Sequence, residues 1–304
     1  MFNQLGLIGC GLMGGSFALA LKRAGLVKRV VGYSKSPSTT DKAKRLGVID
    51  AAVESALQAV AGSDIVLIAV PVGATENIFR AIAQLVEPHV LVMDVGSTKV
   101  DVVDAARRTL KDRVLSFVPA HPIAGREVSG VSNADPSLYV DRRVILTPLA
   151  ENPPELVNKA SAAWSAVGAL VSETTAQQHD AALAAVSHLP HLIAFAFLNG
   201  ITQQPDANEL LSLAGPGFRD FTRIGASDPS VWRDILLSNR VELVKQLQHF
   251  RLALDQLDAT MMAGDGASLE NLIGDASRAR TDWRLAPETA SASPDPLSAA
   301  KRKS

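Results

Sequence analysis

The chain has 304 residues, of which 47% are hydrophobic, and carries 30 basic and 31 acidic side chains. This length accommodates two domains of ordinary size, and the balanced charge argues against nucleic acid or a charged membrane surface as the main partner. The single cysteine, Cys10, excludes an internal disulfide and argues against a structural zinc site, so we predict no metal. Because the longest apolar stretch near the middle, Leu192 to Leu198, is too short to span a bilayer, we expect a cytoplasmic protein.

The first predicted elements surround the stretch QLGLIGCGLMGGSFALALKRAG, which contains the pattern G-x-G-x-x-G at Gly9, Gly11 and Gly14. An apolar strand is predicted at residues 6–8 and a helix at residues 16–22. Strand, glycine turn and helix in this order are typical of a loop that binds the pyrophosphate of a dinucleotide at a helix N-terminus. Alone, the pattern also fits an ordinary strand–helix turn. The predicted cofactor-binding residues of the loop are Gly9, Gly11, Leu12, Met13 and Gly14.

Up to about residue 175, short β-branched runs alternate with segments of helical period. This alternation predicts an α/β fold, a doubly wound parallel sheet of the Rossmann type with helices on both faces. Helices are expected at 40–46 and 75–85. The further predicted strands cover residues 29–33, 65–70, 90–95, 114–118, 143–147 and 169–173.

After residue 175 the sequence becomes rich in Ala and Leu at helical period, which predicts an all-helical domain. We therefore expect a dinucleotide-binding domain at 1–175, a helical substrate and dimerisation domain at 176–285, and a disordered tail at 286–304. The apolar positions in the last long helix are too widely spread for one buried face, which favours a homodimer over a monomeric core. These positions are Leu243, Leu247, Phe250, Leu254 and Leu257.

The residues after the second strand bear on the choice of cofactor. Folds selective for NAD place a carboxylate there, about 20 residues past the glycines, to bond both ribose hydroxyls. Here Ser34, Lys35 and Ser36 occupy the position, and no carboxylate occurs before Asp41. Hydroxyls and an ammonium attract a 2′-phosphate, so we predict NADP as the preferred cofactor, with NAD possible. The alternative is that Lys35 is only a solvated surface charge. Two further cofactor contacts are predicted at Val70 and Pro71.

Four further segments resemble one family. They are DVGSTK (residues 94–99), AHPIAGRE (120–127), SHLPH (187–191) and GPGFRDFTRIGASDPSVWRDI (215–235). In this order they are similar to the prephenate dehydrogenases, also called arogenate or cyclohexadienyl dehydrogenases, over about residues 4 to 284. The resemblance implies a nucleotide-binding domain followed by a helical domain through which two subunits dimerise. It also implies the oxidative decarboxylation of prephenate, or arogenate, with hydride transfer to NADP or NAD.

The resemblance assigns catalytic roles to two residues. The reaction removes a hydroxyl proton, and histidine is the base that titrates near neutrality. His121 of HPIAG is assigned as this base. Ser97 is expected to hydrogen-bond the same hydroxyl and to help hold His121 in a useful tautomer.

The substrate-binding residues are assigned in the same way. Arg223 is expected to grip the ring carboxylate and His191 to face the substrate side chain. The other assigned residues are Ser187, Glu127 at the pocket mouth, and Trp232, for which core packing is the alternative.

Several neighbouring residues receive other interpretations. His188 is expected to be structural, His179 to start a helix without a role in chemistry, and Asp220 to pair with Arg219. Arg126 replaces a residue that is small in typical members, and its role stays open between substrate binding and solvation.

Two other function classes remain as alternatives. A β-hydroxyacid dehydrogenase or imine reductase shares the two-domain plan, but this chain has no lysine between Lys159 and Lys245. A non-catalytic NADP-sensing protein would need the glycine loop and Lys35, but not Ser97, His121 and Arg223 together. The sequence leaves open whether the substrate side chain is pyruvyl or alanyl.

Overall fold

The structure is a computed structural model that describes residues 1–125 and 128–283. Contacts within the chain form one compact unit over Met1–Leu247 and another from Gln248 onward.

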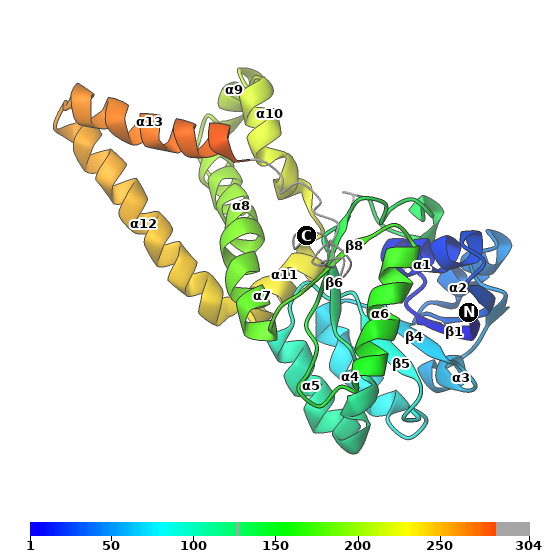
Figure 1. The fold of residues 1–304 in the computed structure, drawn as a ribbon. Helices are drawn as coiled ribbons and strands as arrows, with labels where there is room; N and C mark the ends of the chain where they lie inside the picture. The colour runs from blue at the N-terminus through cyan, green and yellow to red at the C-terminus, as the bar shows by residue number, and fades with distance from the viewer. Residues whose placement is uncertain (126–127, 284–304) are drawn as a thin grey trace, which may run out of the picture. The chain divides into compact units, whose positions relative to one another are not determined.

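A five-stranded sheet forms the centre of the nucleotide-binding part of the first unit. Every pairing within it is parallel, and the strand order is β3-β2-β1-β4-β5. Figure 1 labels β1, β4 and β5. Strands β2 and β3 follow β1 on one side, and β4 and β5 lie on its other side, so the strand order reverses between β1 and β4. At such a switch point a crevice forms beyond the carboxyl ends of the strands, where open α/β sheets bind ligands. The strands are β1 (Phe2–Ile8), β2 (Val27–Tyr33), β3 (Ala51–Ala52), β4 (Ile65–Ile68) and β5 (Leu91–Asp94).

Helices cover both faces of this sheet because its central strands bury side chains on both sides. In β4, Ile65 and Leu67 join one core, whereas Val66 and Ile68 join the other. The first core is closed by α1 (Leu12–Arg23) and α6 (Pro154–Ala166), and the second by α3 (Ala56–Val60), α4 (Val72–Ile82) and α5 (Val100–Leu110). The remaining helix of this part is α2 (Pro37–Arg45). The predicted doubly wound fold is confirmed.

One predicted strand is wrong. Residues 111–116 form a 3-10 helix, η1 (Lys111–Ser116), and only a single parallel bridge joins Val92 to Phe117. Lys111 has a φ of 52°, which turns the chain at the end of α5. Pro119 follows at once and has no N–H to donate, so the ladder with β5 cannot be extended.

The last three strands form a separate sheet instead of continuing the parallel one. They are β6 (Ala120–Pro122), β7 (Arg143–Leu146) and β8 (Leu170–Glu173), in the order β6-β7-β8. The β6–β7 pair is antiparallel and the β7–β8 pair parallel. This differs from the expected single parallel sheet. A short 3-10 turn, η2 (Val131–Asn133), lies between β6 and β7.

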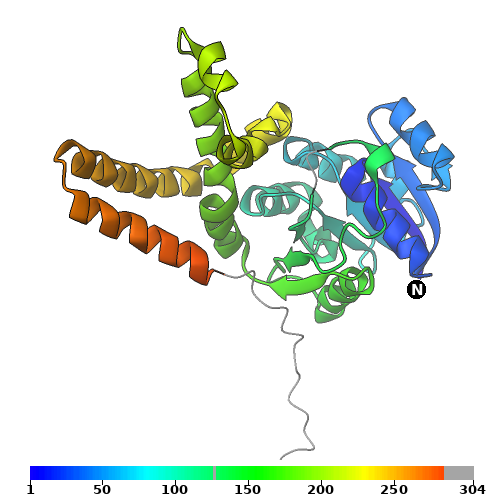
Figure 2. The same ribbon diagram turned by 90° about the horizontal axis from the view of Figure 1, so that it is seen from above.

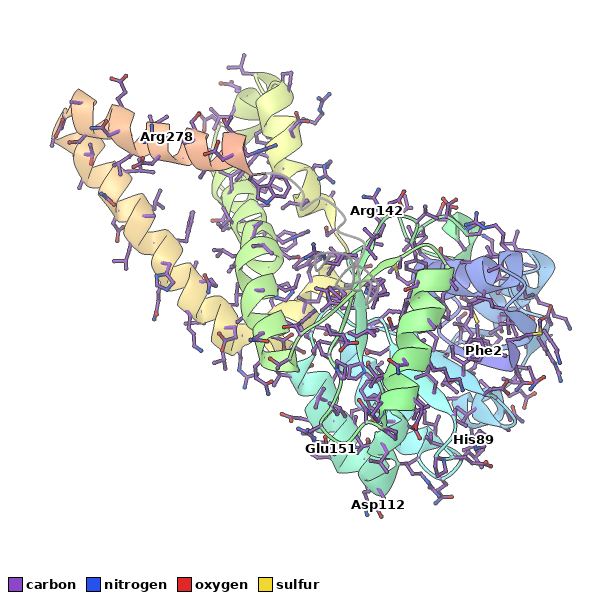
Figure 3. The ribbon with its side chains drawn as sticks, in the orientation of Figure 1. Phe2, His89, Asp112, Arg142, Glu151 and Arg278 are labelled. Atoms are coloured by element: carbon purple, nitrogen blue, oxygen red, sulfur yellow. The ribbon has the colours of Figure 1, made fainter. Side chains whose placement is uncertain are left out.

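Side-chain contacts fix α6 and the β7–α6 connection on this core. The Lys159 ammonium lies 5.3 Å from the centroid of the Phe2 ring, and Arg107 of α5 forms an ion pair with Glu151 at 3.1 Å. Phe2 and Glu151 are both labelled in Figure 3. Inside, the Phe17 and Trp164 rings lie 4.5 Å apart, which packs α1 against α6.

A long helix follows the second sheet. It consists of α7 (Ala176–Leu183), a π-helical turn η3 (Ala184–His188) and α8 (Leu189–Thr202), and it runs without a break in Figure 2. The helix has 27 residues and contains an 18-residue window with a mean hydropathy of 1.8, so it is long and apolar enough to cross a membrane, unlike the shorter stretch Leu192 to Leu198. Its first half carries buried polar residues bonded to the nucleotide-binding part, as described below.

Shorter helices complete the first unit: α9 (Ala207–Ser212), α10 (Pro216–Thr222), the 3-10 turn η4 (Arg223–Ala226) and α11 (Pro229–Ser238). Helix α12 (Arg240–Met262) begins in this unit and continues into the second, where α13 (Gly266–Asp282) follows. Leu243 is buried, whereas Leu252 and Leu254 are more than half exposed. The predicted domain limits stay a prediction, and the predicted tail at 286–304 lies outside the described residues.

Candidate active site

The glycine loop between β1 and α1 has the geometry that a pyrophosphate requires. Gly9 has a φ of 100°, and a Cβ there would lie 2.2 Å from the Ala69 carbonyl oxygen. A Cβ on Gly14 would lie 2.3 Å from the Gly9 carbonyl oxygen, so both positions need glycine. Gly11, in contrast, faces open space. Helix α1 starts at Leu12 without a side-chain cap or an acidic residue in its first turn, which leaves its N–H groups for an anion.

A cavity of about 600 Å³ adjoins this loop. Gly11, Leu12 and Met13 line it, with Val70 and Pro71 beyond β4, so it unites five of the predicted cofactor residues. Ser97 lines the same cavity from the loop after β5, and Trp232 from α11. The helical part of the first unit therefore closes a cavity that opens on the nucleotide-binding loop.

The segment after β2 lies next to the glycine loop. The Cys10 backbone N–H donates to the Ser34 hydroxyl at 2.8 Å, which holds Ser34 against the loop. Lys35 and Ser36 are exposed, and the Ser36 and Ser38 hydroxyls lie 2.9 Å apart at the start of α2. Burial raises the pKa of the Cys10 thiol to about 11, so this side chain stays protonated near neutrality.

The base predicted from the sequence belongs to a buried chain of three side chains. His121 Nδ1 lies 2.8 Å from His179 Nε2, and His179 Nδ1 lies 2.7 Å from Asp180 Oδ1. His121 comes from β6, whereas His179 and Asp180 come from α7. All three are buried, with His121 the most exposed at 8%.

This order of partners fixes the tautomers. The Asp180 carboxylate accepts only, so His179 donates from Nδ1 and its Nε2 is an acceptor. His121 therefore donates from Nδ1 to His179, which leaves His121 Nε2 with a lone pair. Burial, followed by the charges of His179, Lys99 and His188, holds the pKa of His121 well below 6.5. His121 is thus neutral at physiological pH and can accept a proton at Nε2.

Asp180 is held in place from two sides. Its Oδ1 accepts from the Lys99 backbone N–H at 2.8 Å and its Oδ2 from the Val100 N–H at 2.9 Å, at the start of α5. The positive end of that helix stabilises the carboxylate charge. Asn239, after α11, donates from Nδ2 to the Asp180 carbonyl oxygen at 2.7 Å and to His188 Nδ1 at 3.0 Å.

The two histidines of the SHLPH segment, His188 and His191, have different surroundings. His188 is buried through its bond with Asn239, as expected for a structural residue. His191 is half-buried, stacks on Trp232 at a centroid distance of 3.6 Å, and donates from Nδ1 to the Ser187 carbonyl oxygen at 2.9 Å. Trp232 therefore both lines the cavity and supports His191.

Arg223 begins η4 and lies near enough to His191 for its charge to act on the imidazole. Burial lowers the pKa of His191, and the Arg223 guanidinium lowers it further, against the opposite effect of the Ser187 carbonyl. Arg219 and Asp220 form the expected ion pair, at 3.2 Å, on the exposed surface of α10. Glu127 and Arg126 lie outside the described residues.

The structure thus groups the predicted residues in two sets. Ser97 and Trp232 line the cavity with the cofactor loop, whereas His191 stacks on Trp232 and Arg223 lies near enough to His191 to act on its pKa. His121 is buried in β6, and the Asp94 carboxylate links the backbone of Ala120, the residue before it, to that of Gly96, the residue before Ser97. No Ser97–His121 hydrogen bond occurs in the described part of the chain, and His179, not Ser97, fixes the His121 tautomer. The sequence analysis expected His179 to start a helix without a role in chemistry, whereas the structure places it within α7, in contact with His121. Asp180 and Asn239 received no role from the sequence; the acid next to a histidine on an apolar helix was the available signal.

Comparison with known proteins identifies the family and its fold. Residues 17–173 match the model of the prephenate dehydrogenase nucleotide-binding domain, and residues 175–275 match that of the prephenate dehydrogenase dimerization domain. The chain belongs to the prephenate dehydrogenase family. A cyclohexadienyl dehydrogenase of Zymomonas mobilis is 33% identical over 92% of this chain and 96% of its own length.

Solved members of the prephenate dehydrogenase family have the same fold. The Aquifex aeolicus prephenate dehydrogenase, solved with hydroxyphenyl propionate and NAD+, superposes with a TM-score of 0.86 at 33% identity, covering 92% of this chain and 98% of that one. The Synechocystis arogenate dehydrogenase has a TM-score of 0.78 at 27% identity, covering 91% and 99%. The predicted family, architecture and dehydrogenase function are confirmed, as is a nicotinamide dinucleotide as the cofactor class.

Proposed function

We propose that this protein oxidises and decarboxylates prephenate or arogenate, using NADP in preference to NAD, as a cytoplasmic homodimer. The observation that carries the proposal is the buried chain Asp180–His179–His121, which leaves an acceptor nitrogen on His121. A protein that only binds a dinucleotide has no need of such a polarised imidazole. In such a protein, burying these polar groups would lower stability and would serve no function.

The chemistry requires the base at one atom of the substrate. When bound, the nicotinamide ring supplies the acceptor for the hydride that leaves the carbinol carbon. His121 Nε2 takes the proton of the hydroxyl on that carbon as the C–O bond gains double-bond character. The ring carboxylate then leaves as CO2, its bonding electrons make the ring aromatic, and the oxygen regains a proton as a phenol.

The imidazolium formed in this step is stabilised by the residues behind it. As His121 gains a proton at Nε2, its Nδ1–H bond to His179 strengthens, and the Asp180 carboxylate balances the charge through His179. Ser97 lines the cavity and can donate to the same substrate oxygen. Arg223 and His191 supply the polar contacts for the two carboxyl-bearing ends of the substrate.

The preference for NADP is supported by the groups after β2. Ser34 lies against the glycine loop, and neither Ser34, Lys35 nor Ser36 carries a negative charge that would repel a 2′-phosphate. A contact between Lys35 and the phosphate is expected to contribute about 1.5–3 kcal/mol. This corresponds to a preference of about tenfold to a hundredfold.

The homodimer is supported by apolar side chains that the chain itself leaves exposed and by the match to a dimerization domain. The exposed apolar residues of the helical part include Phe197, Leu252, Leu254, Met261, Met262 and Ile273. Light scattering after gel filtration should give twice the 32.1 kDa mass of the chain. A monomer at micromolar concentration would contradict this part of the proposal.

The activity is tested by following absorbance at 340 nm with each combination of prephenate or arogenate and NADP or NAD. We expect NADPH formation with at least one of the two substrates and a higher kcat/KM with NADP than with NAD. Absence of reduced cofactor with both substrates would instead indicate a protein that binds the dinucleotide without turnover. Equal or better use of NAD would contradict the cofactor proposal alone.

A further inference from the structure

The side chains of Asp94 and Lys99 form an ion pair in the interior, next to the loop that carries Ser97. Their side chains are 2% and 0% exposed, and the Lys99 ammonium contacts the Asp94 carboxylate directly. Burying an ion pair gains little net stability, because desolvation of both charges offsets their attraction. The pair therefore calls for an explanation other than stability.

The hydrogen bonds of the pair converge on the neighbours of two predicted catalytic residues. Asp94 Oδ1 accepts from the Ala120 N–H at 3.0 Å, and the Lys99 ammonium donates to the Ala120 carbonyl oxygen at 2.9 Å. Both backbone groups of the residue before His121 are thus held. Asp94 Oδ2 accepts from the Gly96 N–H at 2.9 Å, which holds the residue before Ser97. One carboxylate fixes both segments.

Gly96 shows how closely the loop is held. A Cβ at this position would lie 2.8 Å from Asp94 Oδ2 and 3.5 Å from Lys99 Nζ. A side chain here would push the carboxylate away from the backbone groups that it holds. The loop and the ion pair therefore depend on each other.

The charge of Lys99 also acts on the base. Burial is the largest cause that lowers the pKa of His121, and the charges of His179, Lys99 and His188 follow in that order. These groups come from α7, from the loop before α5 and from η3, and Asp180 faces the base through His179. Among the three groups that act on His121, Lys99 is the ammonium and the other two are imidazoles.

We propose that the buried Asp94–Lys99 pair positions Ser97 and His121 relative to each other and keeps His121 Nε2 available to accept a proton. The inference rests on the proposed function, because it assigns the pair to the base of that reaction. Lys99 is a positioning residue here, since it acts through Ala120 and His121 and not on the substrate itself.

The test uses Lys99→Met, which removes charge and donor, and Lys99→Gln, which keeps an N–H donor for the Ala120 carbonyl. Lys28→Met, at an exposed lysine that donates to the Asn3 side chain of β1, is the matched control. Each protein is labelled with ¹⁵N-histidine, and the His121 signal, assigned by its loss in His121→Asn, is titrated. The pH dependence of kcat/KM is measured on the same proteins.

We expect the His121 titration and the acidic limb of kcat/KM to move to higher pH by about one pH unit in both Lys99 variants. We also expect kcat to fall about tenfold to a hundredfold in Lys99→Met, and less in Lys99→Gln. Lys28→Met should behave as wild type. Titration curves that superpose in wild type and both Lys99 variants would overturn the inference, even if the variants lose thermal stability.

Two further measurements cover a variant that fails to fold and a wild-type protein without activity. If Lys99→Met does not fold because Asp94 is left as an unpaired buried charge, the neutral double variant Asp94→Asn/Lys99→Gln is titrated in its place. If the wild-type protein reduces neither cofactor while its His121 titration still responds to Lys99, the proposed function fails and the coupling of Lys99 to His121 stands.

Discussion

His121 Nδ1 and His179 Nε2 lie 2.8 Å apart, although 58 positions separate the two residues and they come from a strand and a helix of different parts of the first unit. Because of this contact, the proton affinity of His121 in β6 depends on the position of α7, which carries His179. His121 therefore has its fixed tautomer only when β6 and α7 are packed together. Separation of α7 from β6 would leave His121 without its orienting partner.

Replacement of His179 tests this dependence. His179→Gln keeps a hydrogen-bond acceptor near His121 Nδ1 but cannot carry polarisation from Asp180. We expect kcat to fall by about 10²-fold, with the KM for substrate changed little, because ground-state contacts remain. The measurement is steady-state kinetics across pH. A His179→Gln enzyme with wild-type kcat at every pH would show that His179 only fills space.

Replacement of the base itself should have a larger effect. His121→Asn shortens the side chain but can keep an amide N–H donor near the position of Nδ1, toward His179, and it removes the acceptor nitrogen Nε2. We expect kcat to fall by about 10²–10⁴-fold, the usual span for a positioned general base. Binding of the dinucleotide, measured by fluorescence quenching, should stay unchanged because His121 does not line the loop. Undiminished turnover would remove His121 from the mechanism.

The two arginines of the GFRDFTR segment offer a matched pair. Arg223 acts on His191 beside Trp232, whereas Arg219 pairs with Asp220 on the exposed surface. Arg223→Ala should raise the KM for substrate by at least about tenfold, since a charge-assisted contact contributes about 1.5–3 kcal/mol. Arg219→Ala should leave KM within about twofold, because exposed ion pairs contribute little. Equal effects of the two substitutions would contradict the assignment of Arg223.

The choice of cofactor can be reversed by a single carboxylate. Ser34→Asp should place a negative charge where a 2′-phosphate would lie and an acceptor where ribose hydroxyls would lie. We expect kcat/KM with NADP to fall by about tenfold to a hundredfold and kcat/KM with NAD to hold or rise. Lys35→Ala should reduce only the NADP value, with Lys28→Ala as the control. An unchanged ratio in Ser34→Asp would place the adenosine ribose elsewhere.

The sequence predicted the elements that have strong local signals. The glycine loop, the parallel strands around it and the helical second half all follow from short-range patterns, and the structure has them. The strand expected at 114–118 failed because its β-branched run precedes Pro119, and the pairing of β6 with β7 depends on contacts that no local pattern shows.

The site was predictable to the extent that its residues lie in motifs. His121, Ser97 and Trp232 stand in such motifs, and the structure places the last two on one cavity. His179 and Lys99 act through partners far away in the sequence, and their roles follow from burial and hydrogen bonds. A buried charge becomes informative only when its partner is known.

Stability should depend on pH through the buried histidines. Burial is the main cause that lowers the pKa of His188 from 6.5 to about 4 in the folded protein. Between these values the unfolded chain binds a proton that the folded protein does not. The stability of the folded state is therefore full above about pH 6.5 and is lost as the pH falls toward 4, by up to about 3 kcal/mol from this residue. The lowered pKa of His121 acts in the same direction.

His188→Gln isolates this contribution, because a glutamine oxygen can still accept from Asn239 but does not titrate. We expect the free energy of unfolding, from urea denaturation at pH 7, 6 and 5, to fall less steeply with decreasing pH in His188→Gln than in wild type. His249→Gln, at an exposed histidine of α12, should follow the wild-type slope. Equal slopes for wild type and His188→Gln would mean that the pKa of His188 is the same in the folded and unfolded protein, and would contradict the lowering of this pKa by burial.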